Sequence, residues 1–115
     1  VVEPNADLRK RAEALGCSAA ADAGGIPADA VPALVVIAVK PQVIRDVTAT
    51  YKRFDDGRTT FVSIAAGTPV ATFEAILGDR APIVRCMPNT PAAIGKGMMV
   101  VFSNRLVSID TKRFV

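Results

Sequence analysis

Four tracts of the sequence combine small, polar or charged residues that could bind a ligand, and each lies at the end of a short hydrophobic run. The tracts are VEPN at residues 2–5, AVKPQ at residues 38–42, SIAAG at residues 63–67 and RCMPNTP at residues 85–91. In open parallel α/β sheets, ligands bind just outside the carboxyl ends of the strands. If the hydrophobic runs are strands of one sheet, these tracts are its candidate binding loops.

The tract at residues 2–5 contains an acidic residue, Glu3, that could recognise a nucleoside. At the end of a strand in a dinucleotide-binding fold, such a carboxylate hydrogen-bonds the hydroxyls of the adenosine ribose. Glu3 would favour NAD by repelling the 2′-phosphate of NADP, whereas Arg9 and Arg11 could attract that phosphate. On its own, Glu3 is more readily explained as a charged turn residue, so the sequence leaves the cofactor preference open.

Small residues in the second and third tracts would let a ligand approach the backbone. In the second tract, Pro41 ends the strand and offers no N–H donor, and Lys40 would place a cation at the mouth of the sheet. In the third tract, side chains shrink from Ser63 to Gly67, which suits either a tight turn or a flat ring passing over the backbone. The alternative for Lys40 is a solvated charge that follows a core strand.

The fourth tract holds a polar side chain, Asn89, between two prolines. Thr90 and Pro91 form a helix-start signal, which would present free backbone N–H groups to a carboxylate. The alternative is a rigid loop that ties the last strands together. So much stiffened polar backbone at the end of a strand favours a binding role.

Hydrophobic patterning predicts the strands and helices that would position these tracts. The expected strands are residues 33–39, 59–64, 82–86 and 98–102, with short pieces at residues 1–2 and 17–21. The expected helices are residues 6–15, 42–54 and 68–77, and one that starts at Ser108. The run ALVVIAV at residues 33–39 is typical of a central parallel strand covered on both faces. Alternating strands and helices predict an α/β fold with right-handed crossovers and an open parallel sheet.

Turn and cap residues set the expected helix boundaries. Asn5 should cap the first helix and Gly16 should end it. Thr68 is expected to cap the third helix, with Pro69 at its first helical position.

Composition excludes several classes of function. The formal charge of +3 is spread along the chain without a dense basic run, so we expect no nucleic-acid partner. Without histidine, the chain cannot be a His-dependent hydrolase, and two separated cysteines make a metal site improbable. Cys17 and Cys86 are expected to be reduced, buried thiols of a cytoplasmic protein. No apolar run reaches the ~18 residues of a membrane span.

Together, AVKPQ, SIAAG and RCMPNTPAAIGKG, in this order and at these spacings, closely resemble the pyrroline-5-carboxylate reductase family. MPNTP followed by a glycine-punctuated segment is the most specific of these motifs. The other two are shared in looser form with related reductases that are similar to 6-phosphogluconate dehydrogenase. The resemblance implies a Rossmann-like dinucleotide-binding domain and a cytoplasmic homo-oligomer. It also implies reduction of 1-pyrroline-5-carboxylate to L-proline with NADPH or NADH.

The resemblance also implies roles for individual residues. Cofactor-binding residues would be Asn5 at the adenosine end, together with Ala38, Val39, Lys40, Pro41, Ala65, Ala66 and Gly67. Among them, Val39, Lys40 and Ala66 would flank the ribose and nicotinamide. Residues near the substrate would be Met87, Pro88, Asn89, Thr90 and Pro91. No catalytic residue is expected, because a protonated cyclic imine accepts hydride directly, and positioning then matters more than a general base.

Two features of the family lie outside this sequence. Family members begin with a strand and a GxGxxG-type turn that binds the pyrophosphate, and they end with a helical domain that forms the dimer and most of the substrate pocket. We therefore expect residues 1–104 to be an N-terminally incomplete dinucleotide-binding domain, and residues 105–115 to start a helix that leads toward the missing domain. Such a segment alone should bind cofactor very weakly and show no reductase activity. The alternatives are another reductase of that superfamily and a non-catalytic α/β binding module.

Overall fold

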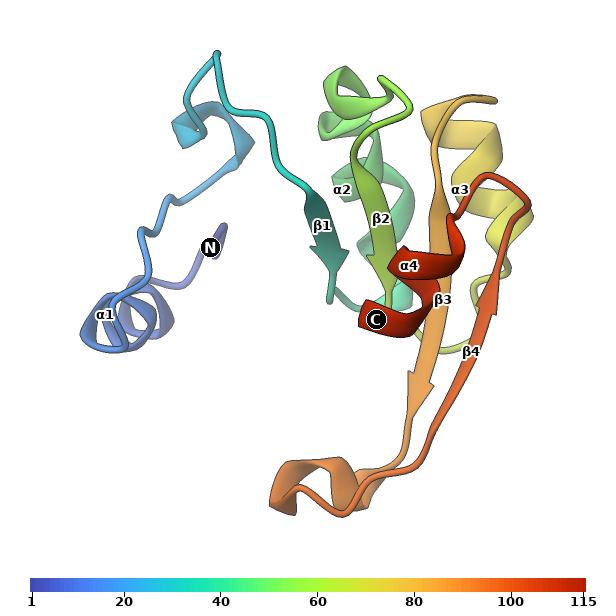
Figure 1. Cartoon of the computed structure of the whole chain (residues 1–115). Coiled ribbons are helices and arrows are strands. Elements are labelled where there is room, and N and C mark those ends of the chain that lie inside the picture. Colours follow the sequence, from blue (N-terminus) through green and yellow to red (C-terminus); the bar gives the residue numbers. More distant parts are fainter. The chain divides into compact units, whose positions relative to one another are not determined.

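The computed structural model describes all 115 residues, which form two compact units, residues 1–30 and residues 31–115 (Figure 1). No helix in either unit is long and apolar enough to cross a membrane.

The first unit is built around helix α1 (Ala6–Ala14). The predicted cap is confirmed: Asn5 Oδ1 accepts hydrogen bonds from the backbone N–H groups of Asp7 at 2.9 Å and Leu8 at 3.1 Å. Gly16 follows the helix in the left-handed region, with φ of +84°, and so stops it as expected. The two predicted strand pieces reduce to a single parallel bridge between Val2 and Ala20, followed by a short 3₁₀ turn at Ala23–Gly25.

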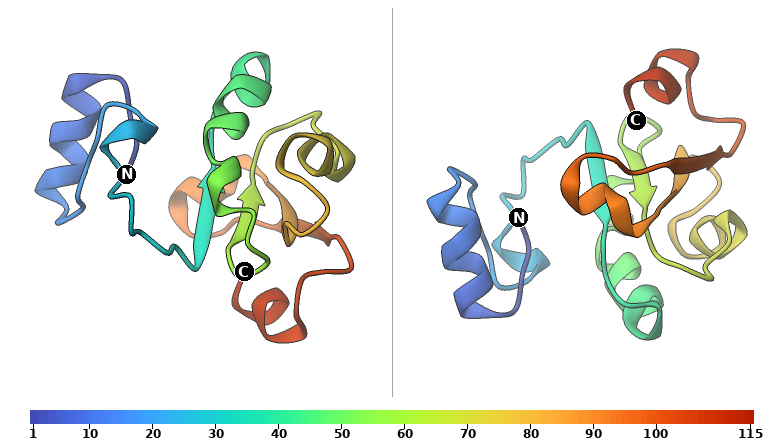
Figure 2. Two further views of the ribbon diagram at one scale, coloured as in Figure 1. Left: turned by 90° about the horizontal axis from the view of Figure 1, so that it is seen from above. Right: turned by 90° about the horizontal axis from the view of Figure 1, so that it is seen from below.

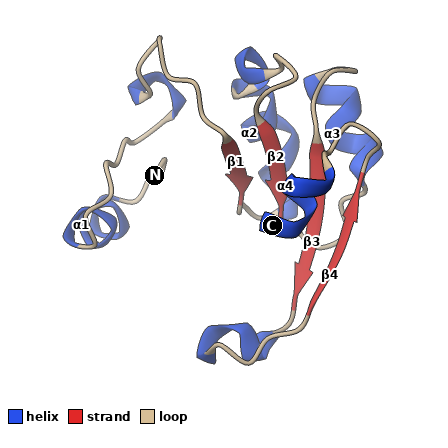
Figure 3. Ribbon diagram, viewed as in Figure 1, coloured by secondary structure: helices blue, strands red, loops and turns tan.

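The second unit contains a four-stranded sheet of β1 (Leu34–Ile37), β2 (Thr60–Ser63), β3 (Ile83–Pro88) and β4 (Met99–Ser103), in that order (Figure 3). The first three strands are parallel, as predicted. The prediction of a fully parallel sheet is wrong for β4, which pairs with β3 in the antiparallel sense. The connection at residues 89–98 is too short for a parallel crossover, which needs about a dozen residues or more.

The position of β1 also differs from the prediction. The run at residues 33–39 was expected in the centre of the sheet, but β1 forms one edge, and Val36 is 58% exposed. A continuous apolar run has the composition of a buried parallel strand, yet it carries no information on how many strands flank it. The strand order therefore had to come from the structure.

Helices cover both faces of this sheet (Figure 2). One face is covered by α2 (Ile44–Thr50), which lies between 3₁₀ turns at Pro41–Val43 and Lys52–Phe54, and by α3 (Val70–Leu77). Helix α4 (Ile109–Phe114) lies over the other face. There, Val62, Val84, Cys86 and Val107 form a buried cluster, against which Leu34 and Val115 pack.

The helices start within two residues of the predicted positions. Ser108 caps α4 as predicted, because its Oγ accepts from the Thr111 N–H at 3.0 Å. The prediction for α3 is wrong in detail. Pro69 is the N-cap, no side chain caps the helix, and the Thr68 hydroxyl donates to the Ala66 carbonyl at 3.4 Å. Proline fixes φ but leaves the first helical N–H groups without a partner.

The two cysteines differ in exposure. Cys86 is buried at 4% exposure, as expected. Cys17 is exposed, which corrects the prediction that both thiols are buried. It follows the Gly16 turn in a unit of only 30 residues, and so short a chain has little interior in which to bury a side chain.

Asn104, just after β4, is a buried hydrogen-bond hub at 9% exposure. Its Nδ2 donates to Ala81 O at 2.9 Å and to Glu74 Oε1 at 3.2 Å. Its Oδ1 accepts from the N–H groups of Ile83 at 3.2 Å and Leu106 at 3.3 Å. The side chain thereby joins α3, the start of β3 and the turn after β4, and every one of its hydrogen-bonding groups has a partner.

Asp56 organises the turn that leads into β2. Its Oδ1 accepts from the N–H groups of Arg58 at 2.9 Å and Thr59 at 3.1 Å, and its Oδ2 lies 2.7 Å from Arg58 Nη2. The hydrogen bonds from the Arg58 and Thr59 backbone lower the pKa of Asp56 from 3.8 to about 2. The ionised carboxylate is therefore the form that holds this turn.

This pKa predicts how stability depends on pH. Because the pKa of Asp56 is lower in the folded state, its contribution is present above the unfolded pKa of about 3.9 and is lost as pH falls through about 2. We expect Asp56→Ala to be less stable than the parent in urea denaturation at pH 6, with the difference shrinking toward pH 2. Asp56→Asn, which cannot ionise, should show a loss with the same pH dependence. A difference that stays constant from pH 6 to pH 2 would contradict this assignment.

Candidate functional site

The second and third tracts meet at the carboxyl ends of β1 and β2. Ile37 and Ser63 are partners in the parallel register, and the Ile64 N–H donates to the Ile37 carbonyl at 3.3 Å. The residues that follow each strand therefore start side by side. This confirms the prediction that the AVKPQ and SIAAG tracts share one edge of the sheet.

A groove of about 400 Å³ opens between the β1–α2 and β2–α3 connections. It is lined by Pro41, Gln42, Ile44, Arg45, Gly67, Thr68, Pro69 and Thr72. Of the predicted cofactor residues, Pro41 and Gly67 line the groove directly. Ala38, Val39, Lys40, Ala65 and Ala66 lie in the same two connections.

The backbone of the third tract makes a tight turn beside this groove. The Ser63 hydroxyl accepts from the Ala65 N–H at 3.2 Å, and Ala65 is buried at 4% exposure. Gly67 has a φ of +70°, and a side chain added there would meet nothing within 4 Å. The tight turn that Gly67 permits therefore also leaves space above the backbone. The two interpretations of this tract, a tight turn and room for a flat ring, are compatible.

The charges around the groove favour an anionic ligand. Helix α3 has no side-chain cap, so the positive end of its dipole opens toward Pro69 and Thr72. Arg45 lines the groove, and the exposed Lys40 precedes the 3₁₀ turn at its rim. On β3, Arg85 is in register with Ser63, and its Nε is buried without a hydrogen-bond partner. All these groups contribute positive potential at the carboxyl edge of the sheet.

Comparison with known proteins shows which proteins this chain is similar to. No family model matches the chain. It is 44% identical over 75 residues to the pyrroline-5-carboxylate reductase of Pseudomonas aeruginosa, covering 65% of this chain and 28% of that relative. It is 36% identical over 81 residues to the reductase of Haemophilus influenzae, covering 70% and 30%.

Solved structures agree with these sequence relatives. A pyrroline-5-carboxylate reductase from Coxiella burnetii matches with a TM-score of 0.86 and 31% identity, covering 99% of this chain and 42% of that one. This chain is homologous to part of the pyrroline-5-carboxylate reductases. It spans about three-tenths of the length of the curated relatives that it matches. A Plasmodium falciparum pyrroline carboxylate reductase solved with NADP bound also matches, with a TM-score of 0.67, 30% identity and coverage of 71% of this chain and 31% of that one.

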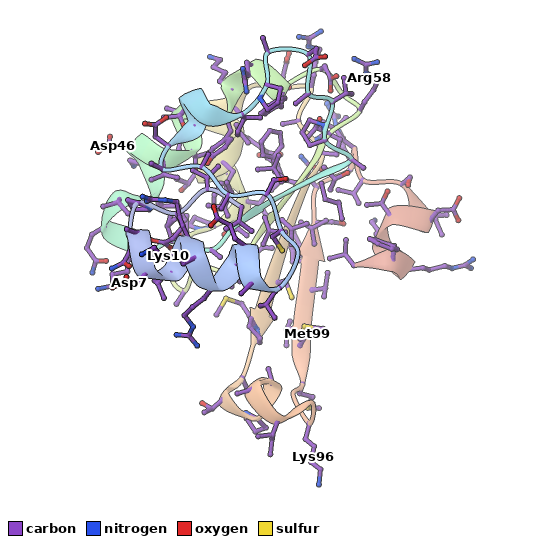
Figure 4. All side chains as sticks on the ribbon, turned by 90° about the vertical axis from the view of Figure 1, so that its left-hand side faces the viewer. Asp7, Lys10, Asp46, Arg58, Lys96 and Met99 are labelled. Atoms are coloured by element: carbon purple, nitrogen blue, oxygen red, sulfur yellow. The ribbon has the colours of Figure 1, made fainter.

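In this chain, the fourth tract forms the end of β3 and the loop beyond it. Met87 and Pro88 are the last residues of β3. The Asn89 N–H donates to the Met98 carbonyl at 3.2 Å, and Asn89 Oδ1 accepts from the Met98 N–H at 2.9 Å. Thr90 and Pro91 begin a 3₁₀ turn, Thr90–Ile94, and are exposed. Asn89 therefore ties the last two strands together, as expected for the alternative of a rigid loop. The loop extends from the carboxyl ends of the strands (Figure 1), and Figure 4 shows Lys96 at its tip.

The first tract forms a braced turn within residues 1–30. Glu3 Oε1 accepts from the Asn5 N–H at 2.8 Å. Arg9 Nη1 donates to the carbonyls of Glu3 at 2.8 Å and Pro4 at 2.7 Å. Because Asn5 caps α1 and Arg9 binds backbone carbonyls, both side chains already hold the turn together.

Six residues that line the groove were not assigned to the cofactor from the sequence: Gln42, Ile44, Arg45, Thr68, Pro69 and Thr72. Arg45 and Thr72 lie in the first turns of the helices that follow β1 and β2, close to the strand ends where ligands bind in such sheets. Their position in a βα unit was the sequence signal that could have identified them. The structure contains no group of three or more His, Cys, Asp or Glu side chains that could hold a metal ion.

Proposed function

We propose that this chain supplies part of the cofactor cleft of an enzyme that reduces 1-pyrroline-5-carboxylate to L-proline with NADPH or NADH. The observation that carries the proposal is the groove between the β1–α2 and β2–α3 connections, with its positive lining and the space above Gly67. Dinucleotide cofactors bind at this edge of open α/β sheets. The relative from Plasmodium falciparum was solved with NADP.

The chain's residues fit the groups of such a cofactor. The small, exposed residues Ala66 and Gly67 suit a flat ring, and the buried Ala65 shapes the turn beneath them. Arg45 with the N-terminus of α3 suits a phosphate. In this proposal, Val39, Lys40 and Ala66 flank the ribose and nicotinamide, together with Ala38 and Pro41. Asn5 belongs to the adenosine end.

The proposed reaction makes small chemical demands on the protein. The cofactor, when bound, supplies a hydride. The substrate's imine carbon accepts that hydride while its nitrogen already carries a proton, so the product is the secondary amine of L-proline. The residues of this chain need to hold the two reactants face to face and complement their charges. Met87, Pro88, Asn89, Thr90 and Pro91 are the proposed residues on the substrate side.

Binding can be tested by NMR titration of the ¹⁵N-labelled chain with NADPH and with NADH. We expect weak, millimolar binding that shifts the amide resonances of Val39, Lys40, Ala66 and Gly67. Resonances around Asn104, at the opposite end of the strands, should not move. Absence of shifts at the carboxyl edge would refute the proposal, and micromolar affinity would contradict the expectation that this segment binds weakly. The chain alone should not turn over substrate.

A matched pair of glycine variants separates binding from folding. Gly67 and Gly57 both have positive φ, at +70° and +78°, and asparagine tolerates this conformation better than other side chains. We expect Gly67→Asn to place its side chain in the groove and weaken NADPH binding several-fold. Gly57→Asn, in the turn before β2, should bind like the parent. Equal affinities of the two variants would exclude the groove as the binding site.

A further inference from the structure

We draw no further inference here: the strongest candidate, the half-buried Arg85 side chain on β3, whose Nε is buried without a hydrogen-bond partner, carries none because nothing in the structure shows which anionic group pairs with it.

Discussion

Phe73→Ala lowers the free energy of unfolding of the second unit by about 3–5 kcal/mol, the expected result of deleting a buried aromatic ring. Phe73 is in α3 and is fully buried, as is Leu77 one turn later. The helix packs against β3 and α2, so the lost ring leaves a cavity that neighbours on fixed elements cannot fill. Because domains are stable by only about 5–15 kcal/mol, this loss removes a large part of the total. Urea denaturation followed by circular dichroism would measure it.

Phe114→Ala is the matched control for this substitution. It deletes the same ring from α4, where Phe114 is 78% exposed. We expect a change within about 0.5 kcal/mol, as for other surface substitutions. Similar losses for the two variants would mean that burial in the structure does not describe the protein in solution.

Asn104→Ala has the second-largest expected effect, a loss of about 2–4 kcal/mol. The substitution leaves the Ile83 N–H and the Ala81 carbonyl without a side-chain partner in a buried setting. A buried polar group without a hydrogen-bond partner costs its full desolvation free energy, which exceeds the net free energy that the lost hydrogen bond contributed. The measurement is again urea denaturation, together with hydrogen exchange at the Ile83 amide, which should accelerate.

Two further variants, Asn104→Asp and Asn89→Ala, test whether the loss of stability comes from the buried hydrogen bonds of Asn104. Asn104→Asp keeps an acceptor for Ile83 and Leu106 but loses the donor and sets a carboxylate beside Glu74. It should therefore be at least as destabilised as the alanine variant at neutral pH. Asn89→Ala removes one bond at the exposed start of the 89–98 connection, and we expect a loss of about 1 kcal/mol or less. If Asn104→Ala lowers the free energy of unfolding no more than Asn89→Ala does, the buried hydrogen bonds of Asn104 do not have the proposed stabilising role.

Local signals in the sequence predicted much of this fold. The cap at Asn5, the stop at Gly16 and the cap at Ser108 depend on residues within one turn, and all three hold in the structure. Strand order and direction depend on contacts between distant residues. The edge position of β1 and the reversal of β4 were therefore missed, because an apolar run has the same composition in any strand order.

The candidate site was predicted in outline for a similar reason. Topology brings the ends of neighbouring parallel strands together, so the meeting of the AVKPQ and SIAAG tracts followed from the fold class. The contribution of Arg45 and Thr72 did not follow, because their helical phase relative to the groove depends on where α2 and α3 begin. The structural bonds of Asn89 and Arg9 also have no distinctive sequence pattern.

Because Cys17 is exposed and Cys86 is buried, the chain contains an internal reference for measuring local opening. An alkylating reagent should modify the exposed Cys17 at once. The Cys86 thiol is buried against Val62, Val84 and Val107, so it becomes accessible only when the segment around Val107 separates from the sheet. Its slow modification, measured against Cys17 in the same tube, reports the free energy of that separation without any denaturant.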